Sequence, residues 1–171
     1  MSRRFVTSDH HFGDKKIIGY ENRPFQSVEH MNLDLIGRWN SVVGKHDTVI
    51  HLGDFSFLPK KETKDILARL NGRKVLILGN HDRGRSVNWW REVGFDQAYE
   101  YPIILDGFYI LSHEPVYVSE NMPYVNVHGH THNKRIDHQQ IINVSVECTD
   151  YKPVLWDSIK TRFASEGEQA E

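Results

Sequence analysis

The sequence predicts an α/β fold with a parallel sheet in its first half and a more β-rich second half. Three short apolar runs, at 4–8, 48–52 and 75–78, indicate strands, and the last run lacks polar alternation. Continuous apolar runs are typical of strands that are covered on both faces. Helical patterns separate the three strands, and right-handed crossovers between successive strands then make a parallel sheet the natural outcome.

The first helix is predicted over 27–43, where apolar residues recur at helical spacing behind Ser27 as the N-cap. A second helix over 60–70 ends at an Asn-Gly pair. A short third helix over 86–93 carries two tryptophans. We expect these tryptophans to pack or to form a lid, because no basic residues are interleaved with them as a nucleic-acid platform would require.

After residue 98 the pattern changes to short strands separated by turns. The predicted strands are 102–105, 108–112, 124–127 and 140–146, with Asp106-Gly107 as a hairpin signal between the first two. Residues 152–163 are expected to add a strand and a final helix. We therefore expect one domain over 1–163 and a disordered acidic tail over 164–171.

Composition narrows the class of protein. The net charge of −2 provides no electrostatic footprint for non-specific binding to duplex DNA, so a phosphate substrate would have to be attracted locally by bound cations. The single cysteine, Cys148, excludes an internal disulfide and a thiolate zinc cage. The first residues lead directly into a strand, and no apolar run approaches the length of a membrane span. We expect a cytoplasmic protein without a membrane partner.

Acids, amides and imidazoles recur directly after the apolar runs, in five separate segments. The candidate metal ligands are Asp9, His11, Asp54, Asn80, His113, His130 and His132. Two pairs among them have i, i+2 spacing, which places both side chains on one side of an extended segment. Each residue alone has an ordinary alternative as a turn, a cap or a surface residue. Their joint occurrence at strand ends favours a metal centre.

This donor set contains oxygen and imidazole ligands but no sulfur, which suits Mn²⁺, Fe, Zn²⁺ or Ni²⁺. We expect two divalent transition-metal ions, with manganese as the first choice. Asp54 is the best candidate for a carboxylate that bridges the ions, because two cations so close together repel strongly unless an anion lies between them. Gly53, Gly79 and Gly129 precede candidate residues and allow close approach of the backbone.

His81 follows Asn80 and is not in the ligand set, so we expect it to face the substrate. As a group that titrates near neutrality, it could stabilise phosphoryl oxygens and protonate the leaving group; the alternative is that it packs or caps a turn. We place Asn80, His10 and Arg83 beside it as candidate substrate contacts. Arg85 is a further candidate, although exposed basic residues are usually solvated surface.

The order and spacing of these residues resemble the calcineurin-like metallophosphoesterases, and the likeness extends over most of the chain. Further stretches resemble the small, single-domain bacterial and phage members of that family. These stretches are Ser8-Asp9-His10-His11-Phe12-Gly13, Arg23-Pro24-Phe25, His51-Leu52-Gly53-Asp54-Phe55 and Leu70-Asn71-Gly72-Arg73-Lys74. The resemblance implies a four-layer α/β/β/α sandwich of two mixed sheets flanked by helices, with the metals at one edge of the sheets.

The resemblance also implies a distribution of ligands and a mechanism. One ion would be held by Asp9, His11, Asp54 and His132, and the other by Asp54, Asn80, His113 and His130. A metal-bridging hydroxide would attack phosphorus in line, with His81 assisting the leaving group.

The chain departs from protein Ser/Thr phosphatases of this type, which carry Asp-x-x-Asp-Arg-Gly where Asp54 is followed here by Phe55-Ser56-Phe57-Leu58. The arginine that grips a phosphate dianion and the aspartate that orients the catalytic histidine are both missing. Asp82 adjoins His81, but a turn-capping role is at least as plausible as orienting that ring. We therefore expect hydrolysis of a small or accessible phosphodiester, such as a cyclic nucleotide or a nucleic-acid end.

Two other functions stay open. One is a phosphomonoesterase of low specificity, and the other is a non-catalytic scaffold of the same fold, which would be expected to have lost ligands. The expected partner is a small phosphoester substrate, and the expected state is a monomer or small homo-oligomer.

Overall fold

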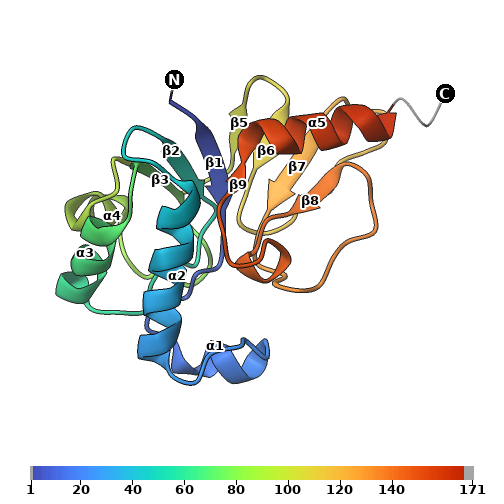
Figure 1. Cartoon of the computed structure of the whole chain (residues 1–171). Coiled ribbons are helices and arrows are strands. Elements are labelled where there is room, and N and C mark those ends of the chain that lie inside the picture. The colour runs from blue at the N-terminus through green and yellow to red at the C-terminus, as the bar shows by residue number, and fades with distance from the viewer. Residues whose placement is uncertain (1, 168–171) are drawn as a thin grey trace.

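The computed structural model describes residues 2–167, which form two sheets with helices outside them (Figure 1). The first sheet has the order β4-β3-β2-β1-β9 and comprises β1 (Arg4–Thr7), β2 (Thr48–His51), β3 (Arg73–Ile77), β4 (Gln97–Tyr99) and β9 (Val154–Leu155). The second sheet has the order β5-β6-β7-β8 and comprises β5 (Ile103–Leu105), β6 (Tyr109–Leu111), β7 (Val125–His128) and β8 (Ile141–Asn143). The helices are α1 (Lys15–Tyr20), α2 (Val28–Val42), α3 (Lys60–Arg69), α4 (Val87–Val93), the 3₁₀ turn η1 (Val146–Cys148) and α5 (Trp156–Gly167).

The pairing of strands confirms the predicted parallel sheet. β1 pairs with β2, and β2 with β3, both in parallel, while β9 joins β1 antiparallel. In the second sheet β5 and β6 form the predicted antiparallel hairpin, whereas β6, β7 and β8 run parallel to one another. Both sheets are therefore mixed, and each gathers several carboxyl strand ends at one edge, where loops can build a site.

Alternate residues of the first sheet belong to two separate cores. Phe5 and Val49 face the core under α2, α3 and α4, whereas Val6 and Ile50 face the core shared with the second sheet. The two-residue period of a strand explains this division, since successive side chains point to opposite faces. It also explains the unbroken apolar runs in the sequence.

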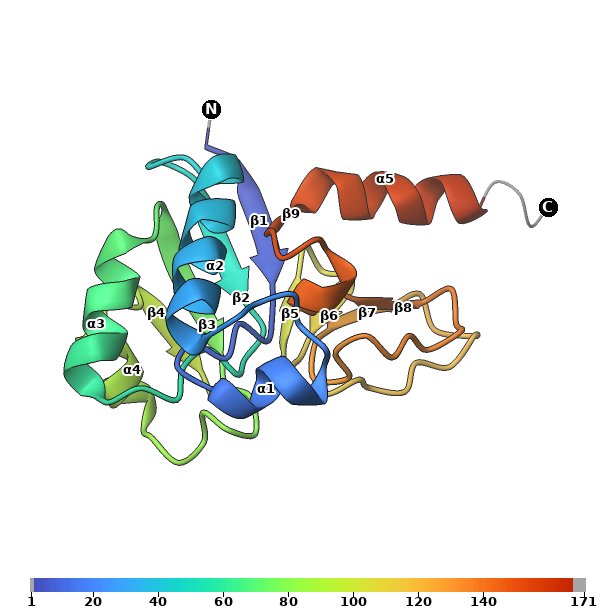
Figure 2. The same ribbon diagram turned by 60° about the horizontal axis from the view of Figure 1, so that its bottom comes forward.

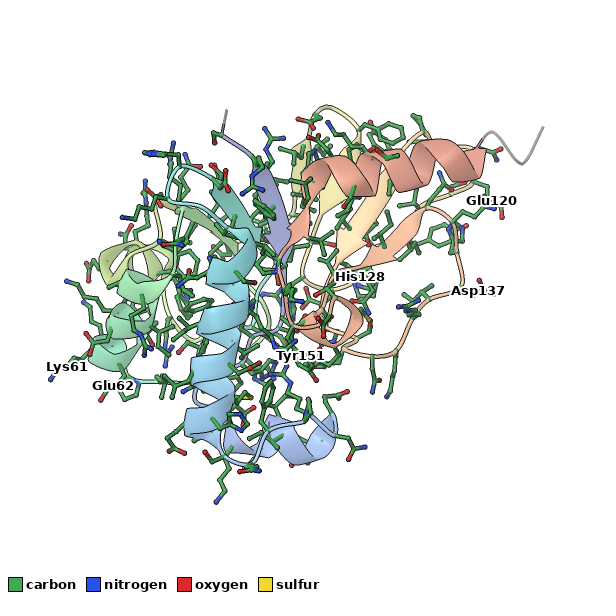
Figure 3. All side chains as sticks on the ribbon, viewed as in Figure 1. Lys61, Glu62, Glu120, His128, Asp137 and Tyr151 are labelled. Atoms are coloured by element: carbon green, nitrogen blue, oxygen red, sulfur yellow. The ribbon has the colours of Figure 1, made fainter. Side chains whose placement is uncertain are left out.

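The helices present the faces that their sequence patterns predicted. In α2 the Ser27 hydroxyl caps the first turn by accepting from the backbone N–H of His30 at 3.1 Å. In α3, Lys61 and Glu62 point outward on the surface of the molecule, while Ile66 and Leu67 are buried (Figure 3). This amphipathic pattern fixes how the helix covers the sheet.

The last helix differs from the expected boundary. α5 lies beside the second sheet (Figure 2) and buries Trp156 and Ile159 in the core that the sheets share. The helix continues to Gly167, so residues 164–167 are helical, although the sequence placed them in a disordered tail. Residues 168–171, the rest of that predicted tail, lie outside the described residues.

Three short elements escaped the sequence patterns, namely α1, β4 and η1. Each is too short for a hydrophobic period to be read, and α1 depends on a local cap, because Asp14 accepts from the backbone N–H of Lys16 at 2.9 Å. Among residues 2–167, none of the helices has the length and apolar character needed to cross a bilayer.

Candidate metal centre

Five loops carry the candidate ligands to one place between the two sheets. They follow β1, β2 and β3 of the first sheet and β6 and β7 of the second, as the sequence predicted. Two groups of side chains gather there, which we name the first cluster (Asp9, His11 and His132) and the second cluster (Asp54, His113 and His130). Within each cluster one donor atom per residue lies within 4.8 Å of the others, a spacing that suits ligands of a common cation.

Asp54 belongs to the second cluster and also lies close to His11 of the first. Its Oδ2 atom is 3.5 Å from Nε2 of His11 and 3.4 Å from Nε2 of His113. Asn80 joins the second cluster, since its Oδ1 atom lies 2.9 Å from Nε2 of His113. This position of Asp54, within reach of ligands from both clusters, is the one that a bridging carboxylate requires.

The hydrogen bonds of Asp9 support a cation in the first cluster. Its Oδ2 atom accepts from the backbone N–H of His130 at 2.9 Å and from the Ser145 hydroxyl at 3.0 Å. Its Oδ1 atom is buried without a hydrogen-bond partner among the described residues. A buried, unpaired carboxylate oxygen is costly, whereas a divalent cation would satisfy it. The residues present therefore fit the metal ions that the sequence predicted.

Three imidazole rings are held in place by a hydrogen bond at Nδ1. Nδ1 of His11 lies 3.2 Å from Asp14 Oδ2, Nδ1 of His113 lies 2.7 Å from the carbonyl of Leu52, and Nδ1 of His132 lies 3.0 Å from Glu147 Oε1. An acceptor at Nδ1 selects the tautomer that leaves Nε2 free to bind a metal. Asp14 and Glu147 were not predicted in this role from the sequence; only Asp14, three residues after His11, offered a local signal.

The backbone at the ligands corrects one part of the prediction. The i, i+2 pairs do reach a common site, but not by lying on one side of an extended segment. Instead φ is positive at five ligands, with values of 62° at Asp9, 53° at His11, 56° at Asp54, 65° at His130 and 49° at His132. Asp and His enter the left-handed region more readily than most residues, which makes these loops possible.

Gly79 and Gly129 are required for close approach at the centre. A Cβ atom at Gly79 would collide with Oδ1 of Asp54, and one at Gly129 would collide with the side chains of Ser8 and Asp9. The glycines predicted from the sequence therefore let the loops pack directly on the ligand carboxylates.

The carboxylates and imidazoles of the centre strongly shift one another's pKa values. Burial would raise the pKa of Asp54, but its interactions with His11 and His113 lower that pKa well below its ordinary range. Burial likewise opposes charge on the imidazoles, yet Asp14 and Asp54 raise the pKa of His11 to about 9, and Asp54 and Asp9 raise the pKa of His113 to about 9. The carboxylates thus create a site for positive charge.

Asp82 joins the loops after β2 and β3 by hydrogen bonds to their backbone, and it does not orient His81. Its carboxylate accepts from the backbone N–H groups of Asp54 at 2.7 Å, Gly79 at 3.0 Å and Phe55 at 3.2 Å. Burial, followed by the charge of Asp54, raises the pKa of Asp82 to about 6. Of the two roles that the sequence left open for Asp82, these contacts favour the capping of backbone N–H groups.

His81 presents its ring at the open side of the centre. Its side chain is 49% exposed, and its Nε2 atom lies 4.0 Å from Asp54 Oδ2. Phe57 contacts both the His81 ring and the His11 ring, with centroid separations of 5.0 and 5.1 Å. His81 is therefore next to the ligands while remaining accessible to a substrate.

His10 does not contact substrate, and that prediction is wrong. The side chain is fully buried, its Nδ1 atom lies 2.9 Å from Nε2 of His51, and its ring stacks on Phe12. Burial, helped by the charge of Arg23, lowers the pKa of His10 to about 3. The left-handed residues on either side of His10 direct their own side chains to the centre and leave His10 in the core.

The two arginines beyond the Asn80 loop have different surroundings. Arg85 donates to the carbonyls of Ser56 at 3.0 Å and Leu58 at 2.8 Å and lies over the ring of Trp89, so it stabilises a loop. Arg83 is half exposed and pairs with Glu114 at 2.8 Å. Contact between Arg83 and a substrate stays a prediction.

Comparison with known proteins identifies the family. The calcineurin-like phosphoesterase profile matches residues 2–162, which is nearly the whole chain. The chain belongs to the calcineurin-like phosphoesterase family. By membership it is a metal-dependent phosphoesterase of a family with dinuclear centres, and the two clusters could hold such metal ions. The resemblance noted in the sequence and the predicted α/β fold with two mixed sheets are confirmed.

Several relatives share the length of this calcineurin-like phosphoesterase. An uncharacterized protein of Methanocaldococcus jannaschii is 37% identical over 93% of this chain and 90% of its own. The gene 66 protein of mycobacterium phage L5 is 31% identical over 86% of this chain and 88% of its own. A crystal structure of a protein of unknown function from Aquifex aeolicus matches with a TM-score of 0.73 and 28% identity, covering 94% of this chain and 99% of that one. These names state no substrate.

Proposed function

We propose that this phosphoesterase hydrolyses phosphodiesters that are small or accessible, such as a cyclic nucleotide or a nucleic-acid end. The observation that carries the proposal is the composition of the segment directly after Asp54. Where protein phosphatases of this type carry an aspartate and an arginine, this chain has Phe57 and Leu58. Leu58 packs against Gly13, and Phe57 is partly exposed beside His81. No guanidinium from this segment can grip the second negative charge of a monoester.

The residues of the centre have separate roles in this proposal. The seven ligands would hold two divalent ions, which supply positive charge for the phosphoryl oxygens and activate water for attack. We expect manganese there, because the mixed oxygen and imidazole donors suit it. His81 would donate a proton to the departing alkoxide, since its ring is exposed on the substrate side. Asn80 would act both on the second cluster and on the substrate.

The charge distribution favours a small substrate over long DNA. The net charge is −2, and Arg83, an exposed cation near the centre, is already paired with Glu114. Long nucleic acids gain most of their affinity from neutralised phosphates, which needs a basic surface. A diester that enters the centre as a compact group would instead be bound mainly by the ions.

The test is a comparison of esters that share one leaving group. Protein stripped of metal and reloaded with Mn²⁺, Ni²⁺ or Zn²⁺ should hydrolyse an aryl phosphodiester with a higher kcat/KM than the corresponding aryl monoester. Cyclic nucleotides and oligonucleotide ends then define the natural class. Preference for the monoester would establish a phosphomonoesterase instead. Tight metal binding without turnover of any ester would favour a non-catalytic scaffold.

A further inference from the structure

We propose that Glu147 is a positioning residue for the first cluster, and that it sets the tautomer and orientation of His132 through a buried relay that also contains Arg23. The inference rests on metal binding at the centre and is independent of the substrate class. It predicts that one of the two ions depends on Glu147 and that the other does not.

Glu147 is buried at the 3₁₀ turn η1, directly behind His132. Its Oε1 atom lies 3.0 Å from Nδ1 of His132, and the same atom accepts from Arg23 Nη2 at 2.6 Å and from Arg23 Nε at 2.9 Å. The Glu147 side chain is 4% exposed, and that of Arg23 is fully buried. Burial of a charged pair is costly, and the geometry here directs three donors onto one oxygen.

Arg23 connects this relay to the other ligands of the first cluster. Its Nη2 atom donates to the backbone carbonyl of Asp9 at 2.7 Å, and its Nη1 atom donates to that of His10 at 2.8 Å. The guanidinium also lies over the partly buried ring of Tyr151, 6.0 Å from its centroid. One buried side chain therefore holds both the loop of Asp9 and His11 and the carboxylate that orients His132.

The second cluster is held differently. Nδ1 of His113 is bonded to the backbone carbonyl of Leu52, and Nε2 of His113 lies near Asn80. No substitution of a side chain removes that carbonyl. The two clusters therefore differ in a testable way, because the ring of His132 depends on a replaceable carboxylate and the ring of His113 does not. Loss of a carboxylate that hydrogen-bonds to a metal-binding histidine typically weakens metal binding by about 10- to 100-fold.

Substitutions at Glu147 can separate positioning from simple neutralisation of Arg23. Glu147→Ala removes the acceptor from His132. Glu147→Gln removes the charge but keeps an oxygen that can accept from the same three donors, while its amide nitrogen takes the place of Oε2, which has no hydrogen-bond partner among the described residues. Asp47→Asn is a matched control, because Asp47 is a buried carboxylate that pairs with Arg3 and no residue of either cluster.

The experiment is a calorimetric titration of the full-length protein with Zn²⁺, combined with NMR of zinc-loaded protein labelled with ¹⁵N at histidine. Wild-type protein should bind two ions. Glu147→Ala should weaken one of them by about 10- to 100-fold, abolish the Nδ1–H signal of His132 and leave that of His113 intact. Glu147→Gln should bind that ion with most of the wild-type affinity. Asp47→Asn should leave the affinity for both ions unchanged.

Several results would overturn the inference. They are equal weakening of both ions in Glu147→Ala, no weakening of either, or the same loss in Asp47→Asn. If the alanine variant does not fold, Glu147→Asp takes its place, because the shorter carboxylate can remain beside Arg23 while withdrawing from His132. Wild-type protein that binds no Zn²⁺ would refute the metal centre itself, whereas unchanged binding in the Glu147 variants refutes only the positioning role.

Discussion

The backbone N–H of His81 donates to Oδ1 of Asp54 at 3.0 Å, while the His81 ring places Nε2 4.0 Å from Oδ2 of the same carboxylate. Asp54, which lies close to residues of both clusters, thus also fixes the main chain of His81. The His81 ring gains its place from its backbone and from Phe57, so it can remain free for a substrate. Asp54 thus lies in contact both with candidate metal ligands and with His81, the side chain to which we assign proton donation.

His81→Asn should therefore remove turnover without removing metal. We expect kcat to fall by about 10²- to 10⁴-fold, the usual contribution of general acid–base catalysis, because the amide cannot donate a proton at neutral pH. Metal content by mass spectrometry should stay at the wild-type level. His46→Asn, a change at an exposed histidine away from the centre, is the control and should leave kcat and metal content unchanged. Full activity of His81→Asn would end the proposed role.

Asp54→Ala should release both ions, because Oδ2 of Asp54 lies close to ligands from both clusters. His130→Ala should weaken only the ion of the second cluster. Equilibrium dialysis followed by metal analysis can measure both effects. Retention of one tightly bound ion in Asp54→Ala would contradict a bridging role for this carboxylate.

Removal of metal should lower the thermal stability of the protein. An ion present at about 100 times its Kd stabilises the folded state by about 2.7 kcal/mol, which for a chain of this size corresponds to roughly 5 to 10 °C in Tm per ion. Calorimetry with and without a chelator should show this shift, and added Mn²⁺ should reverse it. An unchanged Tm would mean that the ions bind weakly or not at all.

Phe57→Ala should alter catalysis without altering metal content. Phe57 is 40% exposed and contacts the ring of His81. Aromatic contacts of this kind contribute about 0.5–1.5 kcal/mol, so we expect kcat/KM for an aryl diester to fall by up to about tenfold. Steady-state kinetics on aryl and alkyl diesters would show whether the effect follows the leaving group. Loss of bound metal instead would show that Phe57 supports His11.

Acid sensitivity should include a contribution from Asp47, far from the metal centre. Backbone hydrogen bonds from Arg3 and Gly44, together with the Arg3 side chain, lower the pKa of Asp47 from 3.8 to about 2. Because the folded pKa is depressed, this stabilisation is complete above about pH 4 and is lost as the pH falls through about 2. Asp47→Asn should cost about 2 kcal/mol at neutral pH. Urea unfolding across pH should show the difference from wild type vanishing at low pH; a constant difference would contradict it.

Much of the fold and the convergence of the candidate ligands could be predicted because local patterns encode them. Unbroken apolar runs marked β1 to β3, and an acid, amide or imidazole after each strand marked the site, since parallel strands end at one edge. The elements that were missed lack such patterns: α1 depends on one cap at Asp14, and β4 contributes only three residues to the sheet edge.

The roles of Glu147 and His10 could not be predicted for a different reason. Glu147 lies next to His132 only because η1 packs against the loop after β7, and nothing in the local sequence encodes that contact. His10 was misplaced because the positive φ values of Asp9 and His11 decide where its ring points, and a sequence pattern does not reveal them. Long-range packing and backbone torsion thus supplied what periodicity could not.

At one candidate ligand, the left-handed backbone conformation sets the demands of folding against those of function. His130 has φ 65° and is exposed, so its conformation costs roughly 1–2 kcal/mol that glycine would not incur. Laboratory evolution that selected only for heat resistance, in medium depleted of transition metals, would therefore be expected to enrich glycine at position 130. The surviving clones would be more stable but would lack a candidate ligand of the second cluster, so stability and metal binding make opposite demands on position 130.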